Sequence, residues 1–146
     1  MQTFLPLADF AASVQALDRQ RLGKQRVEAI QILRTLQGKS KGWANHPAVR
    51  MWQGYEPALA RYGVATCDEW LRRGYVDNCR AEFAAVSQDN HRAPRWLGDE
   101  DFHRSHQSNL VRKLPAHYGP LFPGVPDDLP YVWPPHVEFS TKEPQP

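Results

Sequence analysis

The sequence has few cysteines and no long apolar run. Its 146 residues include two cysteines, Cys67 and Cys79, which lie twelve positions apart. This pair offers neither a disulfide framework nor a zinc motif, so we expect free thiols. No stretch reaches the roughly 20 apolar residues of a membrane span, and residues 1–10 lack the pattern of a signal peptide. We therefore expect a cytoplasmic protein.

Acidic residues are scarce in one part of the chain. Between Arg19 and Arg50 there are eight lysines and arginines but a single acid, Glu28, although the net charge of the chain is only +2. A local excess of cations is typical of a surface that binds nucleic acid by neutralising phosphates. The same cations favour the ionised form of Glu28, and an ionised carboxylate repels phosphate. Its presence here suggests a chemical role. The alternative is a solvated helix face on which Lys24 and Glu28 form an i,i+4 ion pair.

The sequence also lacks the alternating apolar pattern of strands, and helical spacing predicts an all-α fold. We expect a short helix over residues 7–17, followed by a longer helix that Asp18 caps and that ends at Gly38. Glu28 lies on the polar side of the longer helix. Arg26 projects near the apolar side, where it requires a partner.

Further helices are expected over residues 47–52, 66–74, 77–87 and 99–113. Pro57 and Gly63 are expected to break the chain between the first two of them.

Proline is concentrated at the end of the chain. Nine of the thirteen prolines follow Leu114, which predicts turns or extended structure in that region. Tyr131, Val132 and Trp133 are too apolar for a free tail, so we expect them to dock on the helices. The predicted organisation is a single domain over residues 1–139 and a disordered tail over residues 140–146.

Polar and aromatic residues gather in three segments, residues 17–28, 41–52 and 102–113. In the first segment, Glu28 could protonate a leaving base or stabilise positive charge at a sugar carbon. In the second, Trp43 could stack on a base or wedge into an unstacked step. The alternatives are that Trp43 is only a partly buried surface aromatic and that Asn45 begins a helix-entry turn. Trp52 is expected in the core.

The third segment has the pattern of a helix that contacts phosphates, although a solvated amphipathic helix would show a similar one. His103 and His106 share a helix face, but no further ligands with metal-binding spacing accompany them, so we expect no metal and no organic cofactor. The residues predicted to contact DNA are Arg21, Arg26, Lys41, Trp43, Asn45, His46, Arg50, His103, Ser105, His106, Ser108, Arg112 and Lys113.

In this order, the three segments resemble the pyrimidine-dimer DNA glycosylases, the endonuclease V family of the phage T4 type. The runs Met-Gln-Thr-Phe-Leu-Pro and Leu-Asp-Arg-Gln-Arg-Leu-Gly-Lys-Gln-Arg-Val-Glu are similar to a largely uncharacterised bacterial and phage branch of it. The resemblance extends to about Pro123. It implies an all-α fold, DNA binding, N-glycosylase activity on a damaged pyrimidine and an associated lyase that nicks abasic sites.

The resemblance also assigns roles to individual residues. Gln20, Leu22 and Glu28 match the family's helix, which makes Glu28 the catalytic acid. The family's nucleophile is the α-amine of a small residue that removal of the initiator Met exposes. Here Gln2 usually prevents that removal, so the amine belongs to Met1, and an α-amine is generally less basic than a lysine. Lys24 is the substitute candidate.

These observations predict a DNA repair N-glycosylase that acts on a damaged or modified pyrimidine, with abasic-site lyase activity through an amine Schiff base. The expected partner is double-stranded DNA, without an obligate protein partner, and the expected state is a monomer. The resemblance implies a bacterial or phage-encoded protein that associates with the nucleoid. The alternatives are a non-catalytic nucleic-acid-binding module of the same fold and the same chemistry on a different base.

Overall fold

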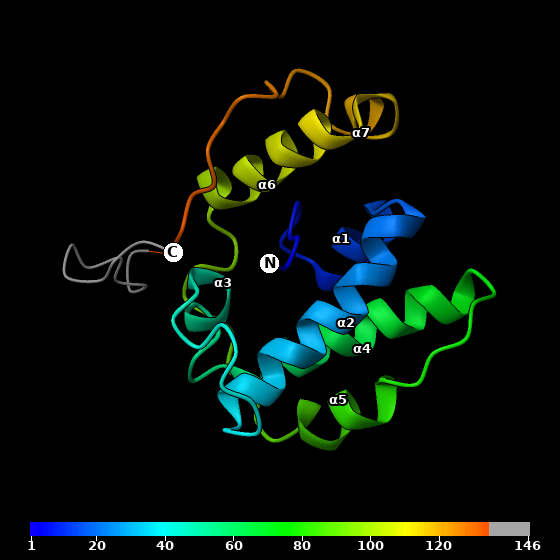
Figure 1. Ribbon diagram of the computed structural model, residues 1–146. Coiled ribbons are helices and arrows are strands. Elements are labelled where there is room, and N and C mark those ends of the chain that lie inside the picture. The colour runs from blue at the N-terminus through cyan, green and yellow to red at the C-terminus, as the bar shows by residue number, and fades with distance from the viewer. Residues whose placement is uncertain (135–146) are drawn as a thin grey trace.

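The computed structural model describes residues 1–134, which form helices and no strand (Figure 1). The predicted all-α class is thus confirmed. The expected domain limit at residue 139 and the expected disordered tail lie outside the described residues. The helices are α1 (Phe10–Ala16), α2 (Arg19–Leu36), α3 (Pro47–Arg50), α4 (Glu56–Arg72), α5 (Arg80–Ser87), α6 (Glu100–Lys113) and α7 (Pro115–Leu121).

Helix α2 begins and ends where the sequence predicts. Asp18 is its N-cap, although its carboxylate accepts hydrogen bonds from the Tyr118 hydroxyl and from Arg21 rather than from the helix backbone. At the other end Gly38 adopts a φ of 77°, which glycine tolerates without strain. The amides of Gly38 and Lys39 then bond back to the last turn, as in a Schellman motif.

Helix α4 corrects the prediction for the middle of the chain. It is one helix from Glu56 to Arg72, whereas the sequence predicted breaks at Pro57 and Gly63. Pro57 lies in the first turn, where the missing amide has no helical partner in any case. Gly63 is needed for packing, because a Cβ there would lie 2.2 Å from Cδ1 of Phe83 on α5. Neither residue therefore interrupts α4: Pro57 fits its first turn, and Gly63 allows Phe83 of α5 to pack against it.

Two helix starts are later than predicted. Helix α1 begins at Phe10, after Asp9, whose carboxylate accepts a hydrogen bond from the Ala12 amide. Helix α5 begins at Arg80, and Asp77 precedes it rather than forming part of it; its carboxylate accepts hydrogen bonds from the amides of Cys79 and Arg80. In both places an aspartate side chain satisfies amides that the helix leaves without partners.

The C-terminal part of the described chain contains a helix that the sequence did not predict. Helix α7 follows α6 directly, and Pro115 occupies its first turn. The proline-rich composition hid this helix. Pro115 suits its first turn, whereas Pro120 lies inside the helix, where proline is normally disfavoured. Beyond α7 the described chain, which ends at residue 134, is irregular, as predicted. Tyr131 and Trp133 pack against the core as predicted, whereas Val132 is exposed, contrary to the prediction.

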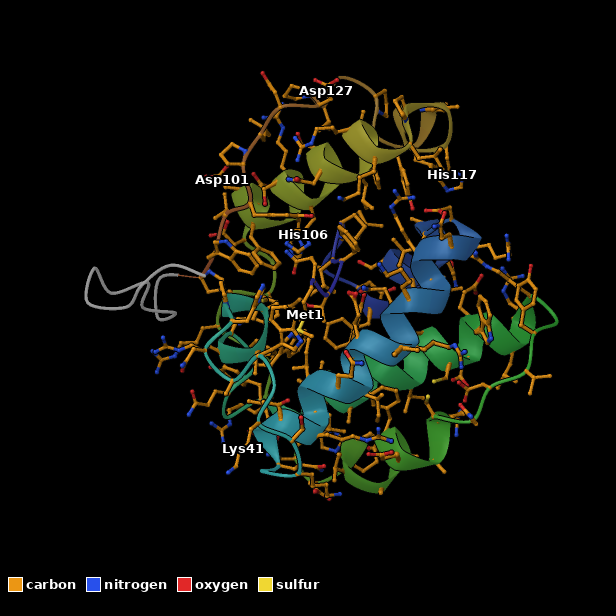
Figure 2. The ribbon with its side chains drawn as sticks, viewed as in Figure 1. Met1, Lys41, Asp101, His106, His117 and Asp127 are labelled. Atoms are coloured by element: carbon orange, nitrogen blue, oxygen red, sulfur yellow. The ribbon has the colours of Figure 1, made fainter. Side chains whose placement is uncertain are left out.

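The first six residues form an extended segment, which we call the N-terminal arm. It lies between the α2 and α4 side of the molecule and α6 (Figures 1 and 2). Leu5 at its centre is completely buried, and so is Trp52, whose position in the core was predicted. The arm therefore passes through the interior, and its far end brings Met1 next to α2.

Candidate functional site

A pocket of about 310 Å³ lies at the start of the N-terminal arm. It joins residues from both ends of the described chain. Its lining residues are Met1, Gln2, Phe4, Gln20, Arg21, Lys24, Gln25, Glu28, Lys113 and Tyr131. The fold thus brings together the three residues predicted to act in catalysis, which are Met1, Lys24 and Glu28.

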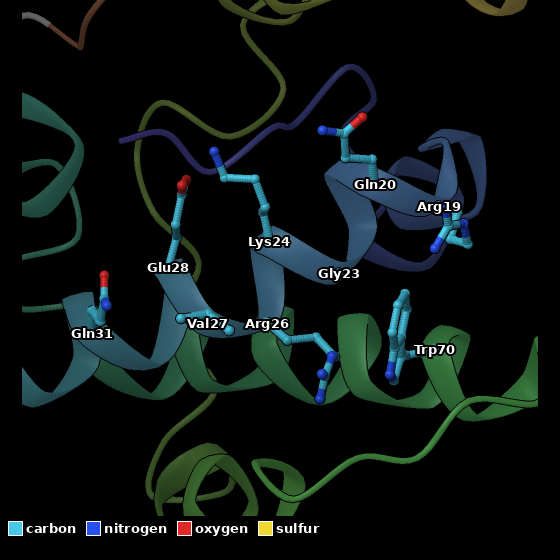
Figure 3. Close-up of a pocket in the computed structure, with 9 residues that line it drawn as sticks. All are labelled: Arg19, Gln20, Gly23, Lys24, Arg26, Val27, Glu28, Gln31 and Trp70. Atoms are coloured by element: carbon cyan, nitrogen blue, oxygen red, sulfur yellow. The ribbon is translucent and has the colours of Figure 1, made fainter.

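A hydrogen bond joins Glu28 to the N-terminal arm. Its Oε1 accepts a hydrogen bond from the amide of Gln2 at 3.3 Å, and the side chain is half-buried. Lys24 lies one turn earlier on α2 and points in the same direction (Figure 3). A carboxylate and an ammonium group therefore stand beside the residue that follows the chain's first amine.

A second hollow of about 560 Å³ lies on the other side of these two residues. Gln20, Lys24 and Glu28 line both hollows, so they form a ridge between them (Figure 3). The floor of the second hollow includes the apolar side chain of Val27 and the indole of Trp70. Its remaining lining residues are Arg19, Gly23, Arg26 and Gln31.

Two tyrosines near the first pocket stay protonated at neutral pH: half-buried Tyr131 lines the pocket, and fully buried Tyr62 lies outside its lining. Burial raises the pKa of Tyr131 to about 12, and the negative charge of Glu28 acts in the same direction. Burial likewise raises the pKa of Tyr62 well above its usual range, again with help from Glu28. Both hydroxyls are therefore neutral hydrogen-bond donors near the carboxylate.

His46 stands near the first amine as a neutral ring. Burial lowers its pKa, and the positive charge of the N-terminal amine lowers it further. Its Nδ1 accepts a hydrogen bond from the Ala48 amide at 3.0 Å and so caps α3. The helix-entry turn that the sequence offered as an alternative for Asn45 and His46 is thus present. The neutral ring carries its hydrogen on Nε2.

Trp43 is an exposed tryptophan in the loop between α2 and α3. The residue is 59% exposed, and its edge-on contact with His46 has a centroid distance of 5.7 Å. Its φ of 64° lies in the left-handed region, which is uncommon for a residue other than glycine and is often found at functional sites. The ring therefore projects from a constrained loop next to His46.

The other residues predicted to bind DNA divide by exposure. Lys41, Asn45, Arg112 and Lys113 are exposed, whereas Arg21 and Arg50 are half-buried. Arg21 forms an ion pair with Asp18 at 3.2 Å while still lining the pocket. Arg112 bonds to the segment that follows α7, because it donates to the carbonyl of Asp127 at 2.8 Å.

Arg26 has a partner within the protein. It forms an ion pair with Asp77, and its guanidinium lies 4.8 Å from the centre of the Trp70 ring. Burial alone would raise the pKa of Asp77, but the hydrogen bond from Arg26 holds it below its usual range. The predicted need for a partner is therefore met, and we do not carry Arg26 into the proposed DNA interface.

The polar residues of α6 are mostly internal, contrary to the surface role that the sequence suggested. His103, Ser105, His106 and Ser108 are all buried. The two histidines bond to the backbone of Leu5, and the two serines accept hydrogen bonds from amides of residues 129 and 132. A buried side chain cannot contact a phosphate on the surface, so we remove these four from the proposed interface.

Sequence reasoning missed Gln25 and Tyr62. Both side chains are buried, and both bond to the N-terminal arm. Gln25 does leave a signal, since it is a polar residue on the apolar side of α2, three positions after Leu22 and four before Ala29. A buried polar group requires hydrogen-bond partners, but the sequence does not say that the partner is the chain's own start.

Among residues 1–134 no group of three or more His, Cys, Asp and Glu side chains is placed to hold a metal ion. In the same part of the chain, no helix has the length and apolar character needed to cross a membrane.

Comparison with known proteins bears on the identity of the chain. A family model described as pyrimidine dimer DNA glycosylase matches residues 1–83, which is more than half of the 146 residues. This match includes Met1, Lys24 and Glu28. Searches of curated proteins and of solved structures found no match. The family match and the all-α fold agree with the resemblance seen in the sequence, and the chain belongs to the pyrimidine dimer DNA glycosylase family.

Proposed function

We propose that this protein is a DNA repair N-glycosylase for a damaged or modified pyrimidine, and that it also cleaves abasic sites through a Schiff base on its first amine. Membership of the family supports the glycosylase class. The observation that carries the proposal is the pocket shared by Met1 and Glu28, with the Gln2 amide bonded to the carboxylate at 3.3 Å.

The proposed chemistry begins with the neutral α-amine of Met1. Its nitrogen forms a bond to C1′ of the damaged nucleotide, and the bond between C1′ and the base breaks. Glu28, as a carboxylate, stabilises the positive charge that develops at the sugar, takes a proton from the nitrogen that has attacked and delivers it to the departing base. The bond between C1′ and O4′ then breaks, the second proton of the nitrogen passes to O4′, and the nitrogen and C1′ form a Schiff base.

The lyase step follows from the Schiff base. A proton leaves C2′, the bond between C3′ and its phosphate oxygen breaks, and the strand is nicked. Hydrolysis of the imine then returns the amine. Glu28 is the proposed acceptor of the C2′ proton, because its carboxylate lines the same pocket as Met1.

In the proposed mode of DNA binding, the cationic side chains around the pocket contact the phosphates. Lys24 and Lys113 line it, and exposed Lys41 lies in the loop that carries Trp43. These positive charges would neutralise phosphates, and Trp43 would stack on an unpaired base or enter an opened step. Arg21, Arg50, Asn45 and His46 complete the proposed interface.

Borohydride trapping on a duplex with one abasic site tests the proposal. A covalent complex that mass spectrometry maps to the Met1 nitrogen would support it. A complex that maps to Lys24 and disappears in Lys24→Ala would move the nucleophile onto α2. Base excision from a lesion-containing duplex without any trapped complex would indicate a water nucleophile, and neither excision from that duplex nor trapping on the abasic one would leave only a DNA-binding module.

The lesion itself requires a separate comparison. Duplexes that contain a cyclobutane pyrimidine dimer, a single oxidised pyrimidine or undamaged sequence are incubated with the protein at equal concentration. Excision from only the damaged duplexes is expected, and the preferred lesion is read from the single-turnover rates.

A further inference from the structure

We propose that Gln25, Tyr62, His103 and His106 are positioning residues that fix the N-terminal arm so that the Met1 amine is held at Glu28. The inference rests on the proposed function, because it concerns the placement of the proposed nucleophile. It assigns a role to polar groups of α2, α4 and α6 that lie behind the pocket.

An extended segment in a helical interior creates a hydrogen-bonding problem. Its backbone amides and carbonyls have no helix or sheet partners, and leaving them buried without partners is costly. In this protein, side chains from three helices supply the partners. The arm is thereby held by directional bonds, in addition to apolar packing of Leu5.

Gln25 of α2 bonds to the first half of the arm. Its Nε2 donates to the carbonyl of Gln2 at 2.7 Å, and its Oε1 accepts from the amide of Phe4 at 2.7 Å. The Tyr62 hydroxyl of α4 lies 2.7 Å from the carbonyl oxygen of Phe4 and 2.6 Å from Oε1 of Gln25. This hydroxyl therefore connects α4 to both the arm and α2.

The two histidines of α6 bond to the second half of the arm. The Nδ1 atom of His106, which is labelled in Figure 2, accepts from the Leu5 amide at 2.9 Å. His103 Nδ1 lies 2.7 Å from the Leu5 carbonyl oxygen. His103 Nε2 accepts from the Gly98 amide at 2.9 Å, so its Nδ1 carries the hydrogen and donates to Leu5. Each histidine thus has a defined tautomer and a separate backbone partner.

These bonds fix the register of the arm as well as its path. Backbone groups of three residues of the arm, Gln2, Phe4 and Leu5, are bonded to different side chains. These partners are Gln25, Tyr62 and His106, respectively. A slip by one residue would break these bonds together and would move Met1 by about 3.3 Å along an extended chain. Attack on C1′ requires the reacting atoms to lie about 3–3.5 Å apart, and a misplacement of about 1 Å can cost about 100-fold in rate. The register therefore decides whether the amine reaches the sugar.

Tyr62→Phe is the most selective test, because it removes one oxygen atom from a residue outside the pocket lining. Tyr118→Phe is the matched control. Tyr118 is also a fully buried tyrosine whose hydroxyl bonds to another element, namely Asp18, but it does not bond to the arm. Gln25→Met is a second variant, which removes the bonds to both Gln2 and Phe4.

Three quantities are measured on each full-length variant, the last two of them well below its melting temperature. They are the melting temperature, the hydrogen–deuterium exchange of the Phe4 and Leu5 amides, and the single-turnover rate of borohydride trapping at Met1 on saturating abasic DNA. We expect both tyrosine variants to melt at lower temperature. Of the two tyrosine variants, only Tyr62→Phe should speed exchange in the arm and slow trapping, by at least about tenfold. Gln25→Met should slow trapping further.

The outcomes separate this inference from the proposed function. If the parent protein is not trapped at Met1, the proposed nucleophile is wrong, and the inference is overturned with it. If the parent is trapped at Met1 but Tyr62→Phe and Gln25→Met are trapped at the parental rate, only the positioning role is overturned. Equal slowing in Tyr62→Phe and Tyr118→Phe would also overturn it, because that slowing would reflect general loss of stability.

Discussion

The polar face of α2 and the polar residues of α6 look alike in sequence but do different things in the structure. On α2, Lys24 and Glu28 line an open pocket. On α6, His103 and His106 are buried and bond to the backbone of Leu5. The difference teaches that a dense polar segment can face solvent or can face a piece of extended chain that needs hydrogen-bond partners.

We therefore propose that the polar face of α2 contacts DNA and that the buried polar residues of α6 stabilise the fold. Substitutions on the polar face of α2 should change DNA binding and activity while sparing stability. Substitutions of the buried polar residues of α6 should change stability and the position of the arm.

The largest expected effect is that of salt on DNA binding. If five or six cations contact phosphates, the logarithm of the association constant should fall with the logarithm of salt concentration with a slope of about −5, or about 1,000-fold between 50 and 200 mM. Fluorescence anisotropy with a labelled duplex measures the slope. Lys24→Gln should reduce its magnitude by about one, whereas Ser108→Ala on α6 should leave it unchanged. A slope near zero for the parent would remove α2 as a DNA-binding surface.

Glu28→Gln should lower base excision by at least about 100-fold, the lower end for a general acid–base group. The side chain is half-buried at the pocket and is not part of the core, so the melting temperature should stay within a few degrees of the parent value. Removing a negative charge beside phosphates should leave DNA binding equal or tighter. Single-turnover excision and thermal melting measure the two properties. If Glu28→Gln excises bases at the parental rate, Glu28 has no catalytic role and is only part of a surface ion pair.

Trp43→Ala should weaken binding to damaged DNA by about tenfold, because stacking of a base on an aromatic ring contributes about 1–3 kcal/mol. The residue is 59% exposed, so the melting temperature should change little. Trp52→Ala is the contrasting variant, since Trp52 is completely buried and its removal should mainly lower the free energy of unfolding. If Trp43→Ala loses stability and Trp52→Ala loses DNA binding instead, Trp43 is the structural residue and Trp52 is the one that contacts DNA.

The smallest expected effect is a dependence of folding stability on pH that arises from His106 of α6. Burial lowers the pKa of His106 to about 3, whereas the unfolded chain has an ordinary histidine pKa near 6.5. The unfolded state therefore binds more protons between these values, and stability falls as pH drops below about 6.5. The free energy of unfolding should decrease by about 1–2 kcal/mol from pH 7 to pH 5. Urea titrations across this range measure it.

His106→Asn is the control for the pH dependence. The amide oxygen of Asn can accept the Leu5 amide in place of Nδ1, but it does not titrate in this range. The decrease between pH 7 and pH 5 should therefore become smaller in this variant. An unchanged decrease would assign the effect to other groups.

Local sequence signals predicted much of the helical structure. Asp18, Gly38 and the apolar spacing between them define α2 with its correct ends, because caps and periodicity act within a few residues. The same local reasoning was wrong at Gly63, since the absence of a side chain there serves the contact with Phe83 on another helix. It was also wrong at Pro115, where proline starts a helix.

The site could be predicted only in part. The lone carboxylate Glu28 and the neighbouring Lys24 stand out in the sequence by charge alone, and the structure places both at the pocket. Tyr62 does not stand out, and the sequence signals at Gln25 and Tyr131 do not reveal that these residues lie beside the arm or beside Glu28. Burial depends on contacts between residues that are tens of positions apart in the chain.

The sequence by itself determined the all-α class, the cap and polar face of α2, and the concentration of positive charge around one acid. These properties follow from short-range periodicity and from composition. Only the tertiary structure decided that the chain's first residues pass between the helices and end beside Glu28. It also decided that the α6 histidines face inward, because an extended arm in the interior requires donors and acceptors that only distant side chains can supply.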